Sequence, residues 1–241
     1  MSKLNLRRGV LAGVAALALA APIAMATGPA MASTPAGLTF GGPRTNVGSD
    51  EISNWGGYVA HGETFTSATA SWTVPNVTCR TSGDLYAPWV GIDGDGTHTV
   101  EQTGVATDCQ TGHPRHEAWY EMYPAAPVYY ADPISTGDKI TATVTANGTT
   151  FTLKITDKTK GWTEQVVKSL ASAERATAEA VIEAPGGYPN IKSVNFTNVM
   201  FNGKKLGTFS QLVAYETQSG SSTIYGPTAI KKQMNFKIKP E

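Results

Sequence analysis

Residues 65–74 read Phe-Thr-Ser-Ala-Thr-Ala-Ser-Trp-Thr-Val, and this stretch decides the class of fold. Hydroxyl-bearing residues alternate in it with Ala68, Ala70, Trp72 and Val74. Because successive side chains of a β-strand point to opposite faces, a period of two predicts a strand with one buried and one exposed face. We therefore expect this stretch to be a half-buried strand of a sheet.

Similar short runs of β-branched and aromatic residues, bounded by turn residues, recur along the chain. Asn147-Gly148, between two of them, is a hairpin turn signal. The one helix-like stretch, residues 168–176, is too short to contribute much. About a dozen strands without an internal repeat predict an all-β protein, an antiparallel β-sandwich of two large sheets of the lectin-like or jelly-roll type. The other runs are residues 89–92, 99–105, 117–123, 139–146, 151–156, 163–168, 177–183, 193–201 and 233–238.

The N-terminus has the composition of a secretory signal peptide. Lys3, Arg7 and Arg8 form a basic segment, and an apolar run follows over residues 10–21. This run is shorter than the ~20 residues of a membrane-spanning helix, and small residues suited to cleavage follow it. We therefore expect a secreted, extracellular protein. The predicted divisions are a signal peptide at residues 1–32, a linker or short pro-segment at 33–50, and one domain at 51–241.

The charge balance argues against two classes of partner. The chain has 19 Lys and Arg residues against 19 Asp and Glu residues, and only 16% of its residues are charged. Without the three basic residues of the predicted signal peptide, 16 basic residues face 19 acidic ones, a net charge of −3. Such a chain lacks the basic excess that nucleic acids or anionic membranes attract. We expect no nucleic-acid partner, no membrane contact after signal cleavage, and a monomer.

Cys79 and Cys109 are the only two cysteines of the chain. In an exported protein such a pair is expected to form a disulfide, which stabilises the fold by about 3–4 kcal/mol in the chain-entropy model. His113 and His116 flank Pro114 in a loop, with no third ligand placed beside them. This pattern favours a surface turn over a metal site, so we expect neither a metal nor a cofactor.

Two familiar functional motifs do not occur in the sequence. There is no Gly-x-Ser-x-Gly elbow, which argues against a serine hydrolase of that kind. Residues 93–97, Asp-Gly-Asp-Gly-Thr, resemble the start of a calcium loop, but its twelfth position is Gly104 rather than Glu. The remaining candidates are carboxylates and amides placed among aromatic residues.

The period of two assigns these candidates to strand faces. Gln102 shares a face with Val100, and Glu179 shares one with Val181. A carboxylate on such a face is either a solvated surface residue or a cleft residue with a perturbed pKa. The face that carries Trp119, Glu121 and Tyr123 joins a large apolar area to a carboxylate, as a substrate groove does.

Five motifs in order resemble the glutamic peptidases, or eqolisins, of filamentous fungi, and more closely their secreted bacterial relatives. The resemblance covers about residues 52–201. The motifs are Asn54-Trp-Gly-Gly-Tyr58, Trp89-Val-Gly-Ile-Asp-Gly94, Gln102-Thr-Gly104, Ala118-Trp-Tyr-Glu-Met-Tyr-Pro124 and Thr177-Ala-Glu-Ala-Val-Ile-Glu183.

The resemblance implies a sandwich of two large antiparallel sheets and an endopeptidase that acts in acid on proteins or peptides. It assigns the catalytic dyad to Gln102 and Glu179. A Glu carboxylate takes a proton from water and returns it to the leaving amine, while a Gln amide donates a hydrogen bond to the developing oxyanion. With Gln rather than a second carboxylate opposite it, we expect Glu179 to stay ionised in acid. The family positions that line or support the cleft correspond to Trp55, Trp89, Asp93, Trp119 and Glu121.

One residue departs from the family pattern, and two other functions remain open. Ala180 replaces the usual large aromatic after the catalytic Glu, and we expect it to face away from Glu179. A glycan-hydrolysing or carbohydrate-binding lectin-like sandwich is one alternative. Glu179 and Glu183 share a strand face but lie ~13 Å apart along it, too far for either glycosidase geometry. The other alternative is a binding module that uses the aromatic face without chemistry.

Overall fold

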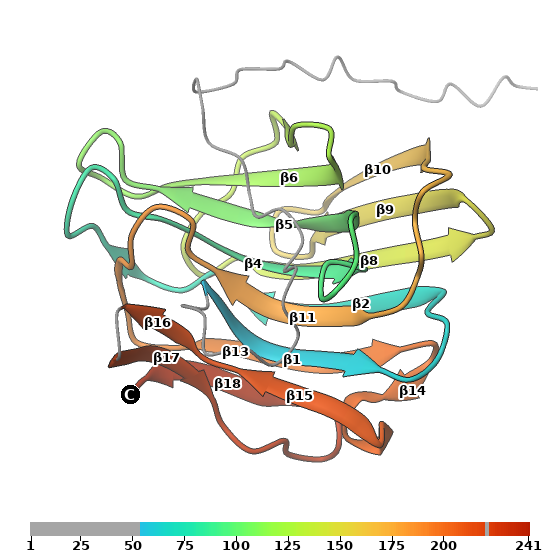
Figure 1. The fold of residues 1–241 in the computed structure, drawn as a ribbon. Helices are drawn as coiled ribbons and strands as arrows, with labels where there is room; N and C mark the ends of the chain where they lie inside the picture. The colour runs from blue at the N-terminus through green and yellow to red at the C-terminus, as the bar shows by residue number, and fades with distance from the viewer. Residues whose placement is uncertain (1–53, 220–221) are drawn as a thin grey trace, which may run out of the picture.

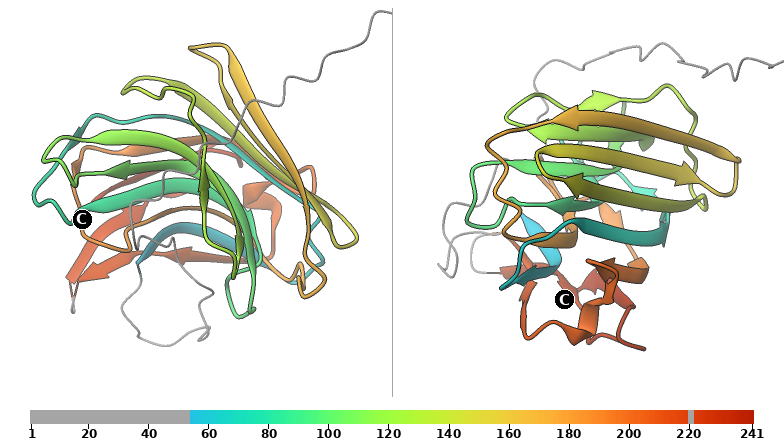
Figure 2. Two further views of the ribbon diagram at one scale, coloured as in Figure 1. Left: turned by 90° about the horizontal axis from the view of Figure 1, so that it is seen from above. Right: turned by 90° about the vertical axis from the view of Figure 1, so that its right-hand side faces the viewer.

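The computed structural model describes residues 54–219 and 222–241. The predicted signal peptide and linker therefore lie outside the described residues. The described chain forms two large antiparallel sheets that pack face to face as curved layers (Figures 1 and 2). This arrangement confirms the predicted all-β sandwich. Within the described ranges the one helical element is a 3-10 turn, η1, at Leu206–Thr208.

The seven-stranded sheet contains all the strands that carry the candidate catalytic pair. Its order is β15-β1-β11-β4-β5-β6-β7, and neighbouring strands pair antiparallel. Its strands are β1 (Trp55–His61), β4 (Leu85–Ile92), β5 (Val100–Asp108), β6 (Arg115–Tyr123), β7 (Val128–Tyr129), β11 (Ala178–Glu183) and β15 (Gln211–Tyr215).

The nine-stranded sheet forms the second layer. Its order is β10-β9-β8-β2-β13-β18-β17-β16, with β14 paired to β13. A separate two-stranded sheet joins β3 (Val77–Thr78) to β12 (Asn190–Ile191). The strands of the large sheet are β2 (Ser67–Thr73), β8 (Lys139–Asn147), β9 (Thr150–Asp157), β10 (Trp162–Ser169), β13 (Val194–Phe201), β14 (Lys204–Lys205), β16 (Thr217–Ser219), β17 (Ser222–Pro227) and β18 (Phe236–Pro240).

The main core lies between the two sheets, and strand alternation builds it. On β2, Ala68, Ala70 and Trp72 are buried, whereas the residues between them are half-buried or exposed, as the period of two predicted. These side chains join one apolar cluster with Val90 and Ala180 of the facing sheet. Ala180 therefore faces the core and not the outer side of its sheet, as expected.

Two predicted elements have different extents in the structure. Residues 168–176 form no helix, because β10 extends to Ser169 and a turn follows. The run predicted from residue 233 becomes a strand only at Phe236, because Lys231 and Asn235 exchange backbone hydrogen bonds and close a turn before it.

Cys79 and Cys109 form the predicted disulfide, with their Cα atoms 5.6 Å apart. Cys79 follows β3, and Cys109 follows β5 directly. The bond therefore ties the small two-stranded sheet to the end of β5, an inner strand of the seven-stranded sheet.

Candidate active site

One cross-strand row on the seven-stranded sheet brings the predicted catalytic residues together. Glu179 of β11 is opposite Gly91 of β4, Gly91 is opposite Gln102 of β5, and Gln102 is opposite Glu121 of β6. Opposed residues of neighbouring strands project to the same face of a sheet. Since Ala180, the next residue after Glu179, faces the main core, this row projects from the outer face.

A second row beside it carries the predicted tryptophans. Val181 is opposite Trp89, Trp89 is opposite Gly104, and Gly104 is opposite Trp119. These residues lie two positions along each strand from the first row, so they share its face. Trp55 joins this group with its ring edge against Trp89, at 4.9 Å between centroids and 83° between planes. The outer face thus pairs polar groups with a fully buried aromatic cluster.

Gly91 lets the Trp89 ring lie against the sheet between the two candidate catalytic residues. A Cβ atom at this position would come within 2.8 Å of Cζ3 of Trp89 and 3.3 Å of Cβ of Gln102. Neighbouring strands lie about 4.8 Å apart, so the Cα atoms of Gln102 and Glu179 are separated by roughly 10 Å. The indole edge of Trp89 therefore forms the floor between the amide and the carboxyl group.

Glu121 holds the Gln102 side chain in place. Nε2 of Gln102 donates a hydrogen bond of 2.6 Å to Oε2 of Glu121. Burial and the neighbouring Glu183 raise the pKa of Glu121 to about 9. Glu121 is therefore a neutral acid in acid and at neutrality, and its carbonyl oxygen accepts the bond. The second N–H of the amide is available for another acceptor.

Glu179 lies in a buried and acidic environment. Its side chain is 0% exposed, and within the described part of the chain its carboxyl oxygens make no hydrogen bond of ordinary length, although the nearby Thr177 hydroxyl favours the charged form. Burial, together with the nearby Asp93, Asp95 and Glu101, raises its pKa well above the usual value for Glu. The raised pKa favours the protonated form of Glu179 in the buried site, against the expectation that this residue stays ionised in acid. The sequence argument considered only Gln102 and omitted burial and the other carboxyl groups.

Asp93 is a buried acceptor of backbone hydrogen bonds close to Glu179. Its carboxylate is 0% exposed and accepts backbone hydrogen bonds of 2.9, 2.7 and 2.7 Å from Glu174, Arg175 and Ala176. Its backbone N–H also donates to the carbonyl of Thr177 at 3.0 Å. Asp93 therefore anchors the segment that leads directly into β11 and Glu179.

A buried group that the sequence analysis missed lies beside Asp93. Oδ2 of Asp95 accepts a 2.6 Å hydrogen bond from the Tyr215 hydroxyl and lies 3.1 Å from Nε2 of His61. These contacts tie the 93–97 loop to β1 and β15. The resemblance covered about residues 52–201, so no motif pointed to Tyr215.

The structure also bears on metal binding by the His113–His116 loop and on membrane-spanning helices. In residues 54–219 and 222–241, no three His, Cys, Asp or Glu side chains are grouped as metal ligands. His116 instead bonds the hydroxyls of Thr107 and Thr136, at 2.8 and 3.2 Å. Among the same residues, no helix is long and apolar enough to cross a membrane.

The described molecule is a β-sandwich protein whose outer sheet face joins buried carboxyl and amide groups to a tryptophan cluster. The chain belongs to the Peptidase A4 family, whose sequence model matches residues 53–236. This match confirms the resemblance to the glutamic peptidases that the ordered motifs indicated.

Two fungal peptidases are similar in sequence. The chain is 32% identical to Aspergillopepsin-2 of Aspergillus niger over 166 residues, which covers 55% of this chain and 59% of that protein. It is 35% identical to scytalidopepsin B of Scytalidium lignicola over 139 residues, which covers 54% of this chain and 51% of that protein. The chain thus matches somewhat more than half the length of these relatives.

Two solved structures share the fold. A structure of scytalido-glutamic peptidase with a transition state analogue inhibitor has a TM-score of 0.70 and 24% identity, covering 79% of this chain and 99% of that one. The structure of aspergilloglutamic peptidase from Aspergillus niger has a TM-score of 0.57 and 24% identity, covering 65% and 99%. At this identity the likeness establishes the β-sandwich and nothing finer.

Proposed function

We propose that this chain is a secreted, acid-acting endopeptidase that hydrolyses peptide bonds with Glu179 and Gln102. The observation that carries this proposal is the row Glu179–Gly91–Gln102–Glu121 on the outer sheet face, in a member of the Peptidase A4 family. The disulfide supports an extracellular location, because such bonds persist in oxidising compartments. In this proposal the enzyme acts on proteins or peptides as a monomer, without nucleic acid, metal or cofactor.

Glu179 serves as the general base and then as the general acid. Its carboxylate takes a proton from water as the water oxygen attacks the peptide carbonyl, and it returns that proton to the amine as the C–N bond breaks. Within the described residues the Thr177 hydroxyl is the nearby side-chain donor to this carboxyl group, and it favours the charged form that acts as the base.

Gln102 serves as the oxyanion donor. One N–H of its amide is held by Glu121, which leaves the other to meet the tetrahedral oxygen. One such donor typically contributes ~3–4 kcal/mol in the transition state. Because Glu121 is neutral in acid, it adds no negative charge beside the developing oxyanion.

In this proposal the three tryptophans form the apolar walls of the substrate site, and Asp93 holds the segment before β11 in place. Trp89 forms the floor between the dyad residues, Trp55 and Trp119 extend it as an apolar wall for substrate side chains, and Asp93 positions the entry to β11. Their burial matches the apolar lining of a ligand site.

Access to the dyad requires an opening of this face. Gln102 and Glu179 are both 0% exposed in the structure. Burial is the largest cause of the raised pKa of Glu179, so in this proposal the water that enters the opened site favours the base form.

Digestion of a denatured protein across acid pH tests the proposal. We expect cleavage in acid that persists with pepstatin, a metal chelator or a serine-protease inhibitor. Inhibition by pepstatin would point to an aspartic mechanism, and cleavage of a glycan instead of a protein would favour the lectin-like alternative.

A further inference from the structure

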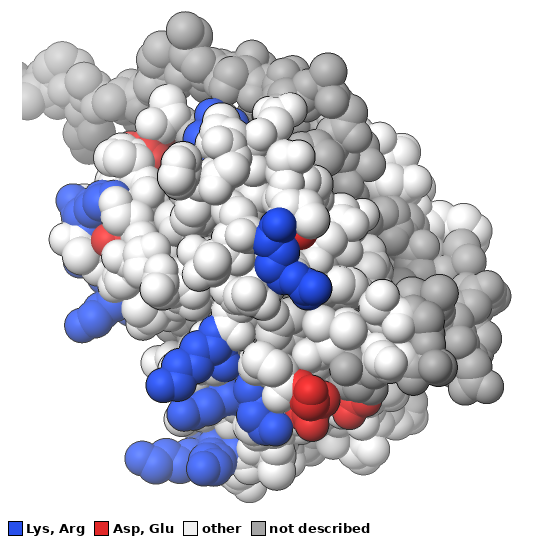
Figure 3. Space-filling model, turned by 90° about the vertical axis from the view of Figure 1, so that its left-hand side faces the viewer, with Lys and Arg blue, Asp and Glu red and all other residues white. Residues whose placement is uncertain are grey.

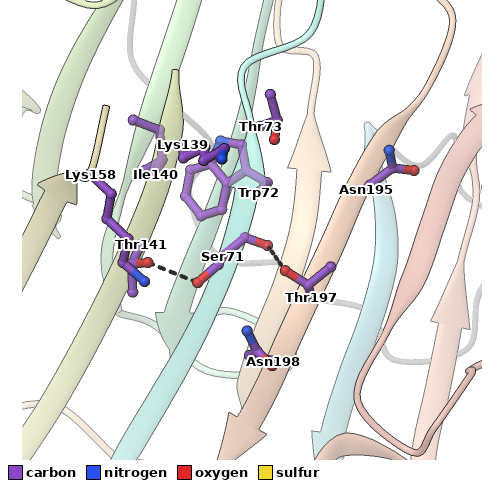
Figure 4. Close-up of a pocket in the computed structure, with 10 residues that line it drawn as sticks. All are labelled: Ser71, Trp72, Thr73, Lys139, Ile140, Thr141, Lys158, Asn195, Thr197 and Asn198. Carbon is purple, nitrogen blue, oxygen red and sulfur yellow. Dashed lines mark hydrogen bonds between the residues drawn. The ribbon is translucent and has the colours of Figure 1, made fainter. Parts of the chain in front are cut away.

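The nine-stranded sheet has two adjoining hollows on its outward side, far from the dyad's face. The first, of 350 Å³, lies over β8, β2 and β13, and its lining includes Ser71, Thr141, Lys139 and Lys158 (Figure 4). The second, of 460 Å³, lies over β13, β18 and the turn before β18, and its lining includes Lys231, Lys232 and Lys237. Asn195 and Thr197 line both, so the hollows form one groove, called here the lysine groove.

The described residues that line the lysine groove carry positive charge and no negative charge. Five lysines line it, and among the described residues no Asp or Glu does. None of the five has an ion-pair partner within the described ranges, whereas Lys160, Lys204 and Lys239 each have one. Basic side chains also gather at the lower left of the molecular surface in Figure 3. A chain with equal numbers of basic and acidic residues thus concentrates unpaired positive charge in one groove.

The local backbone produces the hollow. The pairing of β13 with β2 shifts register between Thr197 and Met200, which marks a β-bulge. Asn198 in the bulge and Lys232 and Gln233 in the adjoining turn all have positive φ, at 54°, 52° and 60°. Such conformations are uncommon for residues other than glycine, and bulges redirect the side chains next to them. The bulge and the turn therefore shape the hollow beside β13, and the turn itself carries Lys231 and Lys232.

We propose that the lysine groove binds a strongly acidic glycan chain, such as one that carries sulfate esters. This binding is separate from peptide hydrolysis and does not depend on the proposed function. The groove crosses four strands, three spacings of about 4.8 Å or roughly 14 Å, which fits a chain better than a single ion. The Asn195 amide lines the groove, and the Ser71 and Thr141 hydroxyls, which bond each other over 2.8 Å, keep lone pairs that can accept hydrogen bonds from sugar hydroxyls.

Two other polyanions fit the groove less well. Single-stranded nucleic acid binds by stacking its bases on accessible aromatic rings, but the rings that line the groove, Trp72, Phe196 and Phe236, are at most 2% exposed. An acidic peptide that adds a strand needs an open sheet edge, but β13 is paired on both sides, with β2 and β18.

Binding of the full chain to dextran sulfate, with uncharged dextran as the blank, tests this proposal. We expect the triple variant Lys231→Gln/Lys232→Gln/Lys237→Gln to bind at least tenfold more weakly than the unmodified chain. The matched control, Lys168→Gln/Lys192→Gln/Lys205→Gln, removes the same charge from exposed lysines outside the groove and should change the affinity less than twofold. Thermal melting of both variants checks that they fold.

Three results would overturn the proposal. They are an absence of binding by the unmodified chain, an equal loss in the two triple variants, and tighter binding of a single-stranded oligonucleotide than of dextran sulfate. Because the readout is binding, an inactive peptidase does not affect it. If the chain does cleave peptides, the groove variant should retain its activity on a short uncharged peptide.

Discussion

Gln102 donates its side-chain amide to Glu121 over 2.6 Å, and the accepting carboxyl group has a pKa raised to about 9. The bond joins β5 to β6 across one step of the sheet. It restricts the amide to an orientation in which one N–H remains for the substrate. Glu121 is therefore a positioning residue of the proposed site, which acts through Gln102.

Glu121→Ala should lower kcat by about 10- to 100-fold with little change in KM, because a freely rotating amide no longer points at the oxyanion. Glu121→Gln, which keeps an acceptor oxygen, should recover most of that loss. Steady-state kinetics on a peptide substrate measure both. A loss confined to KM in the Ala variant would show instead that Glu121 contacts substrate.

Gly91→Ala should impair both stability and activity. The added methyl would meet the Trp89 ring at 2.8 Å and move the floor between Gln102 and Glu179. Overpacking of this kind costs about 1–3 kcal/mol in unfolding free energy. Gly83→Ala is a matched control, because the nearest atom to its new methyl is 3.7 Å away. Equal behaviour of the two variants in urea unfolding and peptide cleavage would contradict the role given to Gly91.

Stability should fall as the pH rises from acid to mildly alkaline. Burial and the nearby Asp93 raise the pKa of Glu101 from 4.5 to about 8. The folded state therefore holds this proton more tightly than the unfolded chain. The contribution of Glu101 to the unfolding free energy is therefore fully present below pH 4.5. It is lost as the pH rises toward 8, by up to about 1.4 kcal/mol per pH unit.

Glu101→Gln removes this titration and tests its sign. The variant should lose less stability than the unmodified chain between about pH 5 and pH 8, as judged from the midpoint of urea unfolding. Parallel curves for the two proteins would show that Glu101 does not titrate in that range.

Removal of the disulfide should destabilise the fold without changing the site directly. Cys79→Ala/Cys109→Ala should lower the unfolding free energy by about 3–4 kcal/mol, mainly by freeing the unfolded chain. Urea unfolding of the double variant and of the oxidised protein gives the difference. A change below about 1 kcal/mol would mean that the loop between the cysteines is already restricted when unfolded.

Local alternation was enough to predict much of the fold. The period of two over residues 65–74 placed Trp72 in the core, and the same rule put Gln102 and Glu121 on faces that the strand registers confirm. These predictions succeeded because the direction of a side chain on a strand depends only on its own position.

Properties that depend on distant strands were not predictable from local pattern. In the sheet, β4 lies between β11 and β5, so Glu179 and Gln102 lie on either side of Gly91. This order of strands cannot be read from the residues of β11 or of β5. Only the resemblance to the glutamic peptidases predicted that Glu179 and Gln102 form a pair. β1 was not predicted as a strand because its two adjacent glycines weaken the pattern, and β15, β16 and β17 are short, with 5, 3 and 6 residues.

The raised pKa of Glu179 illustrates the same limit. The carboxyl groups that raise it come from the 93–97 loop and from β5, and burial contributes most. None of these contributions can be read from the residues next to Glu179 in sequence.

The most direct test of the central claim compares Glu179→Gln and Gln102→Ala with the unmodified chain in cleavage of a denatured protein in acid. Thermal melting of each variant establishes that it is folded. We expect loss of cleavage by at least about 100-fold in each variant, since each removes a group that acts in the transition state. Near-normal cleavage by either folded variant would contradict the assignment of the dyad.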